Sequence, residues 1–308
     1  MYILVTKQLI TMFLIMLCGF IFAKVFRVQE IERKFLSKLL LYFINPCIII
    51  NSFNKEFNND ELKKLLFVVL ISLFITLVMI LIGILTSKNI IDRLCIAFTN
   101  CGFMGIPLIR GVFGEEGVFY LMGYLVIFNF LVWTYGYCQM SGSFNIKKII
   151  LNPNIICIFV GIIIYCMPFT LPQFIKNPLI MIGDLNTAVS MILIGVLLSE
   201  LRIAEVKKYC WSIVKFCFIR LILCGIINIL ILYFVMKVFG GNIGNARLLC
   251  YVVLICSLCP AATSIPGLAC VFNKNASYAS LIVSISSVVC IATLPTLIAL
   301  AELFFSLF

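Results

Sequence analysis

Two stretches of the chain combine an apolar character with residues that interrupt helices. Residues 97–112 read AFTNCGFMGIPLIRGV, and residues 257–272 read SLCPAATSIPGLACVF. Glycine and proline are unusual inside a spanning helix, because they weaken or break its hydrogen bonding. Ile106-Pro107 aligns with Ile265-Pro266 at a shift of 159 residues. Broken apolar segments at matching positions of two chain halves are the best sequence pointer to a transporter's binding site.

The chemistry of such breaks is the binding of an anion by backbone groups. Pro107, Pro260 and Pro266 each remove an N–H donor and disturb a carbonyl one turn earlier, so we expect free backbone groups there. Gly102 and Gly105 permit a second segment to approach closely. If the two segments cross at their breaks, two half-helix N-termini meet, each carrying roughly half an elementary positive charge. Such a place suits a carboxylate.

Small polar side chains accompany both breaks. The amide of Asn100 can donate to a carboxylate or cap a half-helix, and Thr263 and Ser264 offer hydroxyls in the second segment. Two simpler interpretations stay open. Each proline can be an ordinary kink packed against a neighbour, and Asn100 can bond only to another helix.

Few other polar residues lie within apolar runs. Asp184 is a candidate site for a coupling ion, H⁺ or Na⁺, because ionisable groups inside a membrane are usually functional. Arg220 is expected to reach toward the membrane surface or to pair with a carboxylate. The chain has no His and 15 Cys scattered through apolar runs, a pattern that predicts neither a metal site nor a cofactor.

Composition indicates a single integral membrane domain spanning residues 1–308. Hydrophobic residues make up 64% of the chain and charged residues only 11%, whereas soluble domains are about 25% charged. Mean hydropathy is +1.21, so the lipid bilayer must be the main solvent. The net charge of +11 lies in short loops between apolar runs, which argues against nucleic acid as a partner.

Apolar runs predict an all-α protein with ten transmembrane helices, because each run approaches the ~20 residues that cross a bilayer core. The expected spans are 8–26, 36–53, 64–86, 92–112, 117–138, 153–168, 178–199, 210–236, 247–272 and 277–303. A short polar linker at 139–152 separates repeat one, 1–138, from repeat two, 153–308. Five spans per half force the halves into opposite orientations, so we predict inverted repeats with crossed, broken helices 4 and 9.

Lysine and arginine predict the orientation of the chain. With both termini outside the cell membrane, the inside loops carry 14 basic residues and the outside segments carry 8. Cytoplasmic loops are enriched in these residues, so both ends are expected to be extracellular and the linker cytoplasmic. Gly19 in the first span and Gly161 in the sixth match at a shift of 142, which supports the repeat.

These features together resemble the auxin efflux carrier family, which includes bacterial malate and malonate permeases. The most specific element is Asn100-Cys-Gly-Phe-Met-Gly-Ile-Pro107, close to the family pattern N-x-x-x-M-G-I-P-L. Further matches are Pro46, Asn129-x-x-x-Trp133, Asn152-Pro153, Gly195, Pro266 and Thr293-Leu-Pro295. The resemblance covers essentially the whole chain. The short middle linker departs from the plant members, whose long loop is regulatory, and this departure weakens a prediction of auxin as substrate.

The resemblance implies a fold like that of bile-acid symporters and an elevator exchange between outward-open and inward-open states. It implies an organic-anion substrate whose carboxylate lies near Asn100, with Asn51, Asn129 and Ser190 completing the pocket. A homodimer is compatible with the family.

We therefore expect a secondary transporter of small organic carboxylates rather than an enzyme. A membrane enzyme would need paired carboxylates, a metal site or a nucleophile with its base, and the spans offer none of these. No phosphate-binding loop is present, so ATP-driven transport would need another subunit. A channel or sensor on the same fold remains the alternative.

Overall fold

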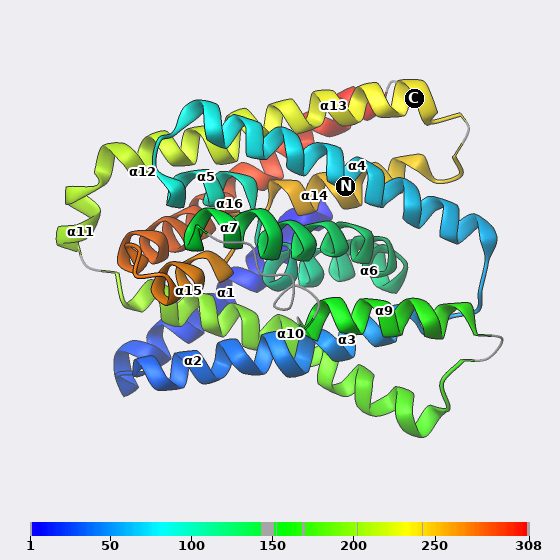
Figure 1. Cartoon of the computed structure of the whole chain (residues 1–308), viewed down its shortest axis with the longest axis horizontal. Helices are drawn as coiled ribbons and strands as arrows, with labels where there is room; N and C mark the ends of the chain where they lie inside the picture. The colour runs from blue at the N-terminus through cyan, green and yellow to red at the C-terminus, as the bar shows by residue number, and fades with distance from the viewer. Residues whose placement is uncertain are drawn as a thin grey trace.

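The computed structural model describes residues 2–142, 151, 153–167, 170–201, 203–241 and 243–306. Within this part of the chain the backbone is almost entirely helical (Figure 1), and its only β pairing is a single bridge between Thr99 and Ala261. The prediction of an all-α integral membrane protein is confirmed.

The first half of the chain supplies the first five spans. They are built from α1 (Tyr2–Phe26), α2 (Glu30–Leu39), the π-helical turn η1 (Leu40–Ile44), α3 (Asn45–Phe53), α4 (Asn59–Thr86), α5 (Ile90–Ala97), η2 (Cys101–Gly105), α6 (Ile106–Leu131), η3 (Val132–Gly136) and α7 (Tyr137–Ser141).

The second half supplies the other five. They are built from α9 (Pro153–Cys166), α10 (Gln173–Ser199), the short α11 (Ile203–Lys208), α12 (Cys210–Cys217), η4 (Phe218–Leu223), α13 (Cys224–Phe239), α14 (Ala246–Leu258), α15 (Ser264–Val271) and α16 (Ala276–Phe305).

Every predicted span has a helical counterpart, but two boundaries differ from expectation. Seven helical stretches are long and apolar enough to cross a membrane on their own, and α9 and α14 are shorter apolar helices. The expected loop between spans 4 and 5 is reduced to a turn at Gly114, whose φ of 64° suits glycine. At the linker, α7 extends helix to Ser141, and residues 143–150 and 152 lie outside the described residues.

The helices form two groups that we name the panel and the core. The panel contains α1, α2 with α3, α9 and α10; the core contains α4 to α7 and α12 to α16. In Figure 1 much of the panel lies along the lower edge, and α4 and α13 of the core lie along the upper edge. In the panel α1 packs on α10 and α9 packs on α3. These pairs are equivalent under an exchange of the two chain halves, as inverted repeats require.

Glycines permit this panel packing. A Cβ added to Gly19 would lie 2.6 Å from the carbonyl oxygen of Ile192 on α10, and one added to Gly161 would lie 2.5 Å from Cδ2 of the Phe53 ring on α3. The two glycines that match in sequence therefore play the same part in the two halves. Small residues at helix interfaces allow close van der Waals contact, which drives association in lipid.

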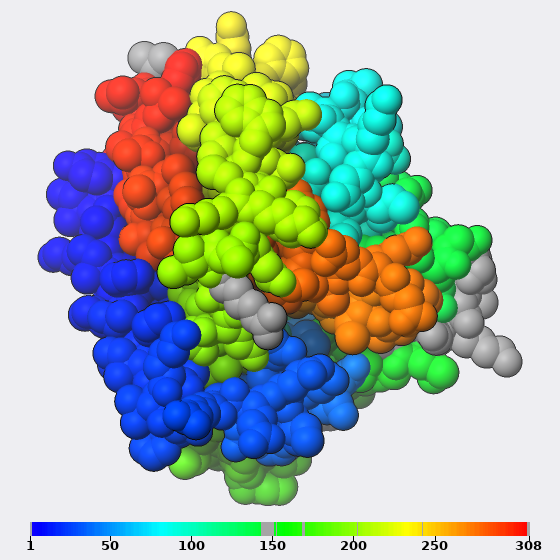
Figure 2. All heavy atoms as spheres, turned by 90° about the vertical axis from the view of Figure 1, so that its left-hand side faces the viewer, coloured from blue at the N-terminus to red at the C-terminus, as the bar shows by residue number. Residues whose placement is uncertain are grey.

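Both described ends of the chain lie on one face of the molecule, which we call the terminal face; the other is the loop face. Figure 2 looks onto the loop face, where the blue end of α1 with α2, the yellow-green α11 and the orange α15 are visible. The assignment of the terminal face to the outside of the cell rests on the charge count and stays a prediction.

The outer surface of the bundle is apolar. Its exposed side chains include Leu14, Leu70, Phe159, Phe234 and Leu303, each at least half exposed. Soluble monomers rarely expose continuous apolar patches of this kind. The burial pattern therefore supports lipid as the surrounding solvent.

We expect Gly195→Ala to destabilise the protein, because an added Cβ would lie 2.7 Å from the Phe20 amide nitrogen on α1. Overpacking of this kind costs about 1–3 kcal/mol. Gly267→Ala on α15 is the control, since nothing lies within 4 Å of its added Cβ. Thermal unfolding in detergent should show a lower midpoint only for Gly195→Ala; equal midpoints would contradict the close α1–α10 contact.

Candidate functional site

The two broken helices cross and pair through their backbones. Helix α5 ends at Ala97 and α14 ends at Leu258. The backbone amide of Asn100 donates to the Pro260 carbonyl at 2.8 Å, and the backbone amide of Ala262 donates to the Phe98 carbonyl at 3.0 Å. These reciprocal bonds form the antiparallel bridge between Thr99 and Ala261. The predicted crossing of helices 4 and 9 is confirmed.

The prolines occupy different positions from those expected. Pro266 is the third residue of α15 and lies in its first helical turn, whereas Pro107 follows the π-helical turn η2, which begins at Cys101 and continues into α6. A first turn tolerates proline, because its N–H groups have no helical partner anyway. Pro260 alone lies in a break. The interruptions therefore fall before the Ile-Pro pairs, at residues 98–100 and 259–263.

Asn100 carries an unused donor at the crossing. Its backbone carbonyl accepts from the amides of Met104 at 3.0 Å and Gly105 at 3.2 Å. The residue is 3% exposed, and its Nδ2 atom has no hydrogen-bond partner among the described residues. Ser264 is the first residue of α15, and its buried Oγ also has no hydrogen-bond partner among the described residues. Thr263 precedes it as N-cap without a side-chain bond to the helix.

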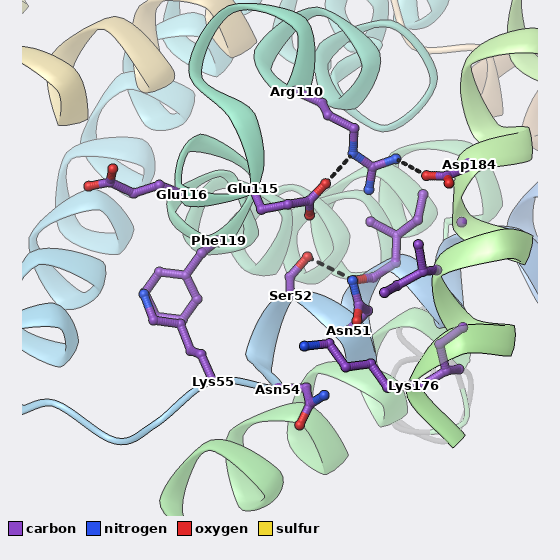
Figure 3. A pocket seen from close by; sticks show the side chains of 14 residues that line it. Asn51, Ser52, Asn54, Lys55, Arg110, Glu115, Glu116, Phe119, Lys176 and Asp184 are labelled. Atoms are coloured by element: carbon purple, nitrogen blue, oxygen red, sulfur yellow. Dashed lines mark hydrogen bonds and ion pairs between the residues drawn. The ribbon is translucent and has the colours of Figure 1, made fainter. Parts of the chain in front are cut away.

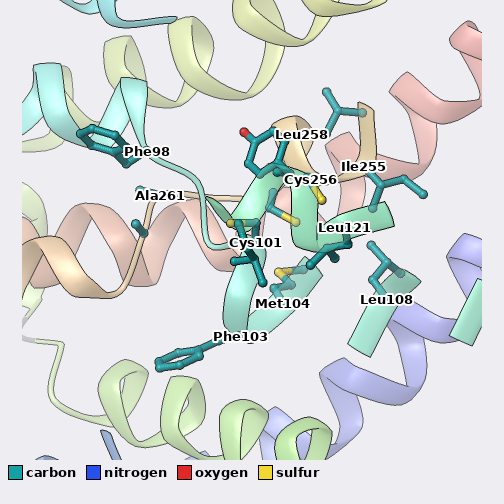
Figure 4. Packing of buried hydrophobic residues seen from close by; sticks show 14 of the residues in the cluster. Phe98, Cys101, Phe103, Met104, Leu108, Leu121, Ile255, Cys256, Leu258 and Ala261 are labelled. Atoms are coloured by element: carbon teal, nitrogen blue, oxygen red, sulfur yellow. The ribbon is translucent and has the colours of Figure 1, made fainter. Parts of the chain in front are cut away.

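Tight packing holds the crossing in place. A Cβ added to Gly105 would lie 3.4 Å from Cβ of Cys101 and 3.7 Å from Sγ of Cys259. Figure 4 shows Cys101, Cys256 and Met104 within this cluster of buried residues. A Cβ added to Gly102 would instead lie 3.8 Å from Nδ2 of Asn45. Gly105 therefore faces the second half of the chain, and Gly102 faces the panel.

A polar cavity of about 440 Å³ opens near the terminal face, between panel and core. Figure 3 shows its lining. The residues that line it are Ile48, Asn51, Ser52, Asn54, Lys55, Arg110, Glu115, Glu116, Phe119, Lys176, Leu179, Ile180, Gly183 and Asp184. Asn51, expected from the family resemblance, is among them, and its buried Oδ1 has no described partner.

Ion pairs organise the charge in this cavity. Arg110 of α6 lies between two carboxylates (Figure 3): its Nε is 2.8 Å from Glu115, and its Nη1 is 3.5 Å from Asp184 of α10. The Lys55 ammonium lies 2.9 Å from Glu61 and 4.2 Å from the centre of the Phe119 ring. No described ion pair involves Lys176. Lys176 is thus the cation of this cavity lining that has no described ion-pair partner.

An asparagine pair lies between the cavity and the crossing. Asn186 of α10 donates to Asn45 of α3 at 2.9 Å, and both residues are buried. Each lies one helical turn beyond a cavity-lining residue, Ile48 on α3 and Gly183 on α10. With Gly102 beside Asn45, the pair connects the panel to the crossing.

The sequence analysis did not select Asn45 or Asn186 as site residues. Their separation of 141 residues is close to the 142-residue shift that relates Gly19 to Gly161. Two polar residues separated by the repeat shift, one of them in Asn45-Pro46, were the signal that could have identified the pair.

Three other candidates lie apart from these groups or differ in role. Asn129 is buried in α6, and its amide donates to the Leu125 carbonyl of its own helix at 2.9 Å. The Ser190 hydroxyl donates to Thr187 within α10 at 3.2 Å. Arg220 neither reaches the surface nor pairs with a described carboxylate, contrary to expectation; it is 1% exposed and bonds to backbone carbonyls.

Crossed, broken helices beside a polar cavity are typical of transporters that span a membrane. The model of the family described as membrane transport protein matches residues 4–145 and 139–298 of this chain. The chain therefore belongs to this family, that of the auxin efflux carriers, and is a membrane transporter. A search of curated proteins finds no match.

We expect Asn186→Ala to destabilise the panel, because it leaves the buried Asn45 side-chain carbonyl without its donor. An unsatisfied buried polar group costs about 1–3 kcal/mol. Ser190→Ala on the same helix is the matched control, since its hydroxyl bonds only within α10. Chemical denaturation in detergent micelles should separate the two variants; a Ser190→Ala loss as large as that of Asn186→Ala would contradict a special role for the pair.

Proposed function

We propose that the protein is a secondary transporter that carries small organic carboxylates across the cell membrane by alternating access. The observation that supports this most is the unused amide donor of Asn100 at the crossing. A buried polar group without a partner costs free energy, and a structure retains one where function requires it. A ligand carboxylate would satisfy it.

The crossing offers several donors of the kind that a carboxylate needs. Helical turns begin at Cys101 in η2 and at Ser264 in α15, both directly after a break. Helix N-termini favour anions through their free N–H groups and dipoles. Asn100 Nδ2 and Ser264 Oγ would add side-chain donors.

The cavity would serve as the vestibule on the terminal face. Its volume of about 440 Å³ lies at the small end of ligand pockets, which span about 300–1,000 Å³. Lys176, which has no described ion-pair partner, would attract anions toward the asparagine pair. A small acid fits such a route better than a large amphipathic molecule.

Alternating access would follow from movement of the core against the panel. Two polar contacts link α6 to the panel near the terminal face: Gln8 of α1 donates to the Pro107 carbonyl at 3.3 Å, and Arg110 reaches Asp184. Partly exposed contacts of this kind contribute little free energy each, so they can break during transport. The homodimer suggested by the family resemblance stays a prediction.

Uptake of labelled malate, malonate and indole-acetate into proteoliposomes tests the proposal. We expect Asn100→Ala to lower uptake about tenfold to hundredfold, because a hydrogen bond to a charged group contributes about 1.5–3 kcal/mol. Asn228→Ala is the control; this buried asparagine of α13 contacts the Met79 sulfur at 4.0 Å. Wild-type uptake of none of these acids, or unchanged uptake by Asn100→Ala, would contradict the proposed substrate class or site.

Asp184 is the residue that we predict to couple transport to a proton gradient. Its carboxylate lies on the panel and its partner Arg110 on the core, so protonation would weaken a link between the two groups. We expect a pH gradient to change wild-type flux and Asp184→Asn to lose that response, while Glu116→Gln keeps it. A flux that follows only the substrate's own gradient would exclude this coupling.

A further inference from the structure

Arg220 is a buried cation at the crossing. It lies in η4, the π-helical stretch between α12 and α13, and is 1% exposed. Its Nη2 atom donates to the carbonyls of Ser257 at 2.8 Å and Cys259 at 2.6 Å. These two carbonyls belong to the last turn of α14 and its C-cap, at the break of the ninth span. The Nε and Nη1 atoms have no hydrogen-bond partner among the described residues.

The charge of this guanidinium is balanced by backbone dipoles. None of the described ion pairs includes Arg220, and arginine does not lose its proton in proteins. A helix C-terminus carries roughly half an elementary negative charge, and the C-terminus of α14 lies directly at Nη2. A buried charge without a carboxylate is costly, so its presence calls for a reason beyond packing.

Half-helix C-terminal ends and unwound carbonyls are where related transporter architectures hold their coupling Na⁺ or H⁺. In this protein the guanidinium occupies that position, with a nitrogen already bonded to two of the carbonyls. We propose that Arg220 is a resident cation that takes the place of a coupling Na⁺ at the crossing, so that the transporter works without sodium. This inference rests on the proposed transport function for its effect on flux.

The position of Arg220 also connects it to the ligand site. Arg220 donates to the Cys259 carbonyl, and Cys259 directly precedes Pro260. The Pro260 carbonyl accepts a hydrogen bond from the backbone amide of Asn100. Two consecutive carbonyls of the second break therefore accept hydrogen bonds, one from the Arg220 guanidinium and the next from the backbone of Asn100. Arg220 is thus a positioning residue: it keeps the second break in the shape that Asn100 requires, and its charge favours an anion nearby.

The crossing is asymmetric in this respect. At the equivalent end of α5, the Phe98 carbonyl accepts from the backbone amide of Ala262. No described hydrogen bond brings a cationic side chain to the last carbonyls of α5. A purely structural need to satisfy a half-helix end would apply to both ends alike, whereas a resident cation is needed only once.

Thermal unfolding of the detergent-purified full chain tests the cation role without any substrate. Wild-type midpoints should agree in sodium chloride and choline chloride at equal ionic strength. Arg220→Ala should have a lower midpoint that sodium or methylguanidinium, but not choline, partly restores. Arg247→Ala, at the exposed N-terminal end of the same helix α14, should behave as wild type in both salts.

Proteoliposome uptake with sodium or choline on both sides tests the consequence for transport. Wild-type uptake should be the same in the two salts, and Arg220→Ala should lose about tenfold or more in choline, as the removal of a buried charge partner predicts. Arg220→Lys keeps the charge and should keep more uptake, still without sodium dependence. Arg247→Ala should stay within about twofold of wild type.

Two results would overturn the inference. One is a sodium-specific rise in wild-type midpoint or uptake; the other is an Arg220→Ala protein that matches wild type in choline. If Arg220→Ala does not fold, the wild-type salt comparison and Arg220→Lys decide the question in the same way. If wild type carries none of the acids tested, the proposed substrate class fails, while the unfolding midpoints still decide the role of Arg220.

Discussion

The rest of the structure depends on two reciprocal hydrogen bonds, from Asn100 to Pro260 and from Ala262 to Phe98. In lipid, each unsatisfied backbone group costs several kcal/mol, so a broken spanning helix cannot face the bilayer. Two breaks can satisfy one another only by lying side by side, deep inside protein. The ten spans therefore surround the crossing, and the crossing sets where each of them must pass.

The same constraint explains what polar chemistry is left over. Beside the paired breaks, the buried side-chain atoms without a described partner are Nδ2 of Asn100, Oγ of Ser264, and Nε and Nη1 of Arg220. They lie where new half-helices begin or old ones end, so local dipoles favour an anion at one end and a cation at the other. The polar groups that could bind a ligand at this site are thus those left over when the backbones of the two breaks pair.

Sequence patterns predicted much of this architecture, because lipid imposes a simple rule on span length and the repeat leaves matching Ile-Pro pairs. The spans, the crossing and the role of Gly19 and Gly161 follow from such patterns. The exact breaks do not, since Pro107 and Pro266 lie inside the helices that follow the breaks, and only the paired backbone reveals residues 98–100 as the interruption. The Asn45–Asn186 bond and the carbonyl partners of Arg220 join distant spans, which no local pattern can indicate.

The inverted repeat provides two equivalent backbones, but the side chains at the breaks are not equivalent. One break carries Asn100, which has an amide donor; the other carries Cys259 and Pro260, whose neighbouring cation is Arg220 from another span. A symmetric crossing would present the same field to a ligand from both halves. Because a neutral donor lies on one side and a fixed positive charge on the other, the electric field at the site differs between its two sides. With the role that we propose for Arg220, an anion would be held there without a second ion, because the protein would supply the positive charge itself.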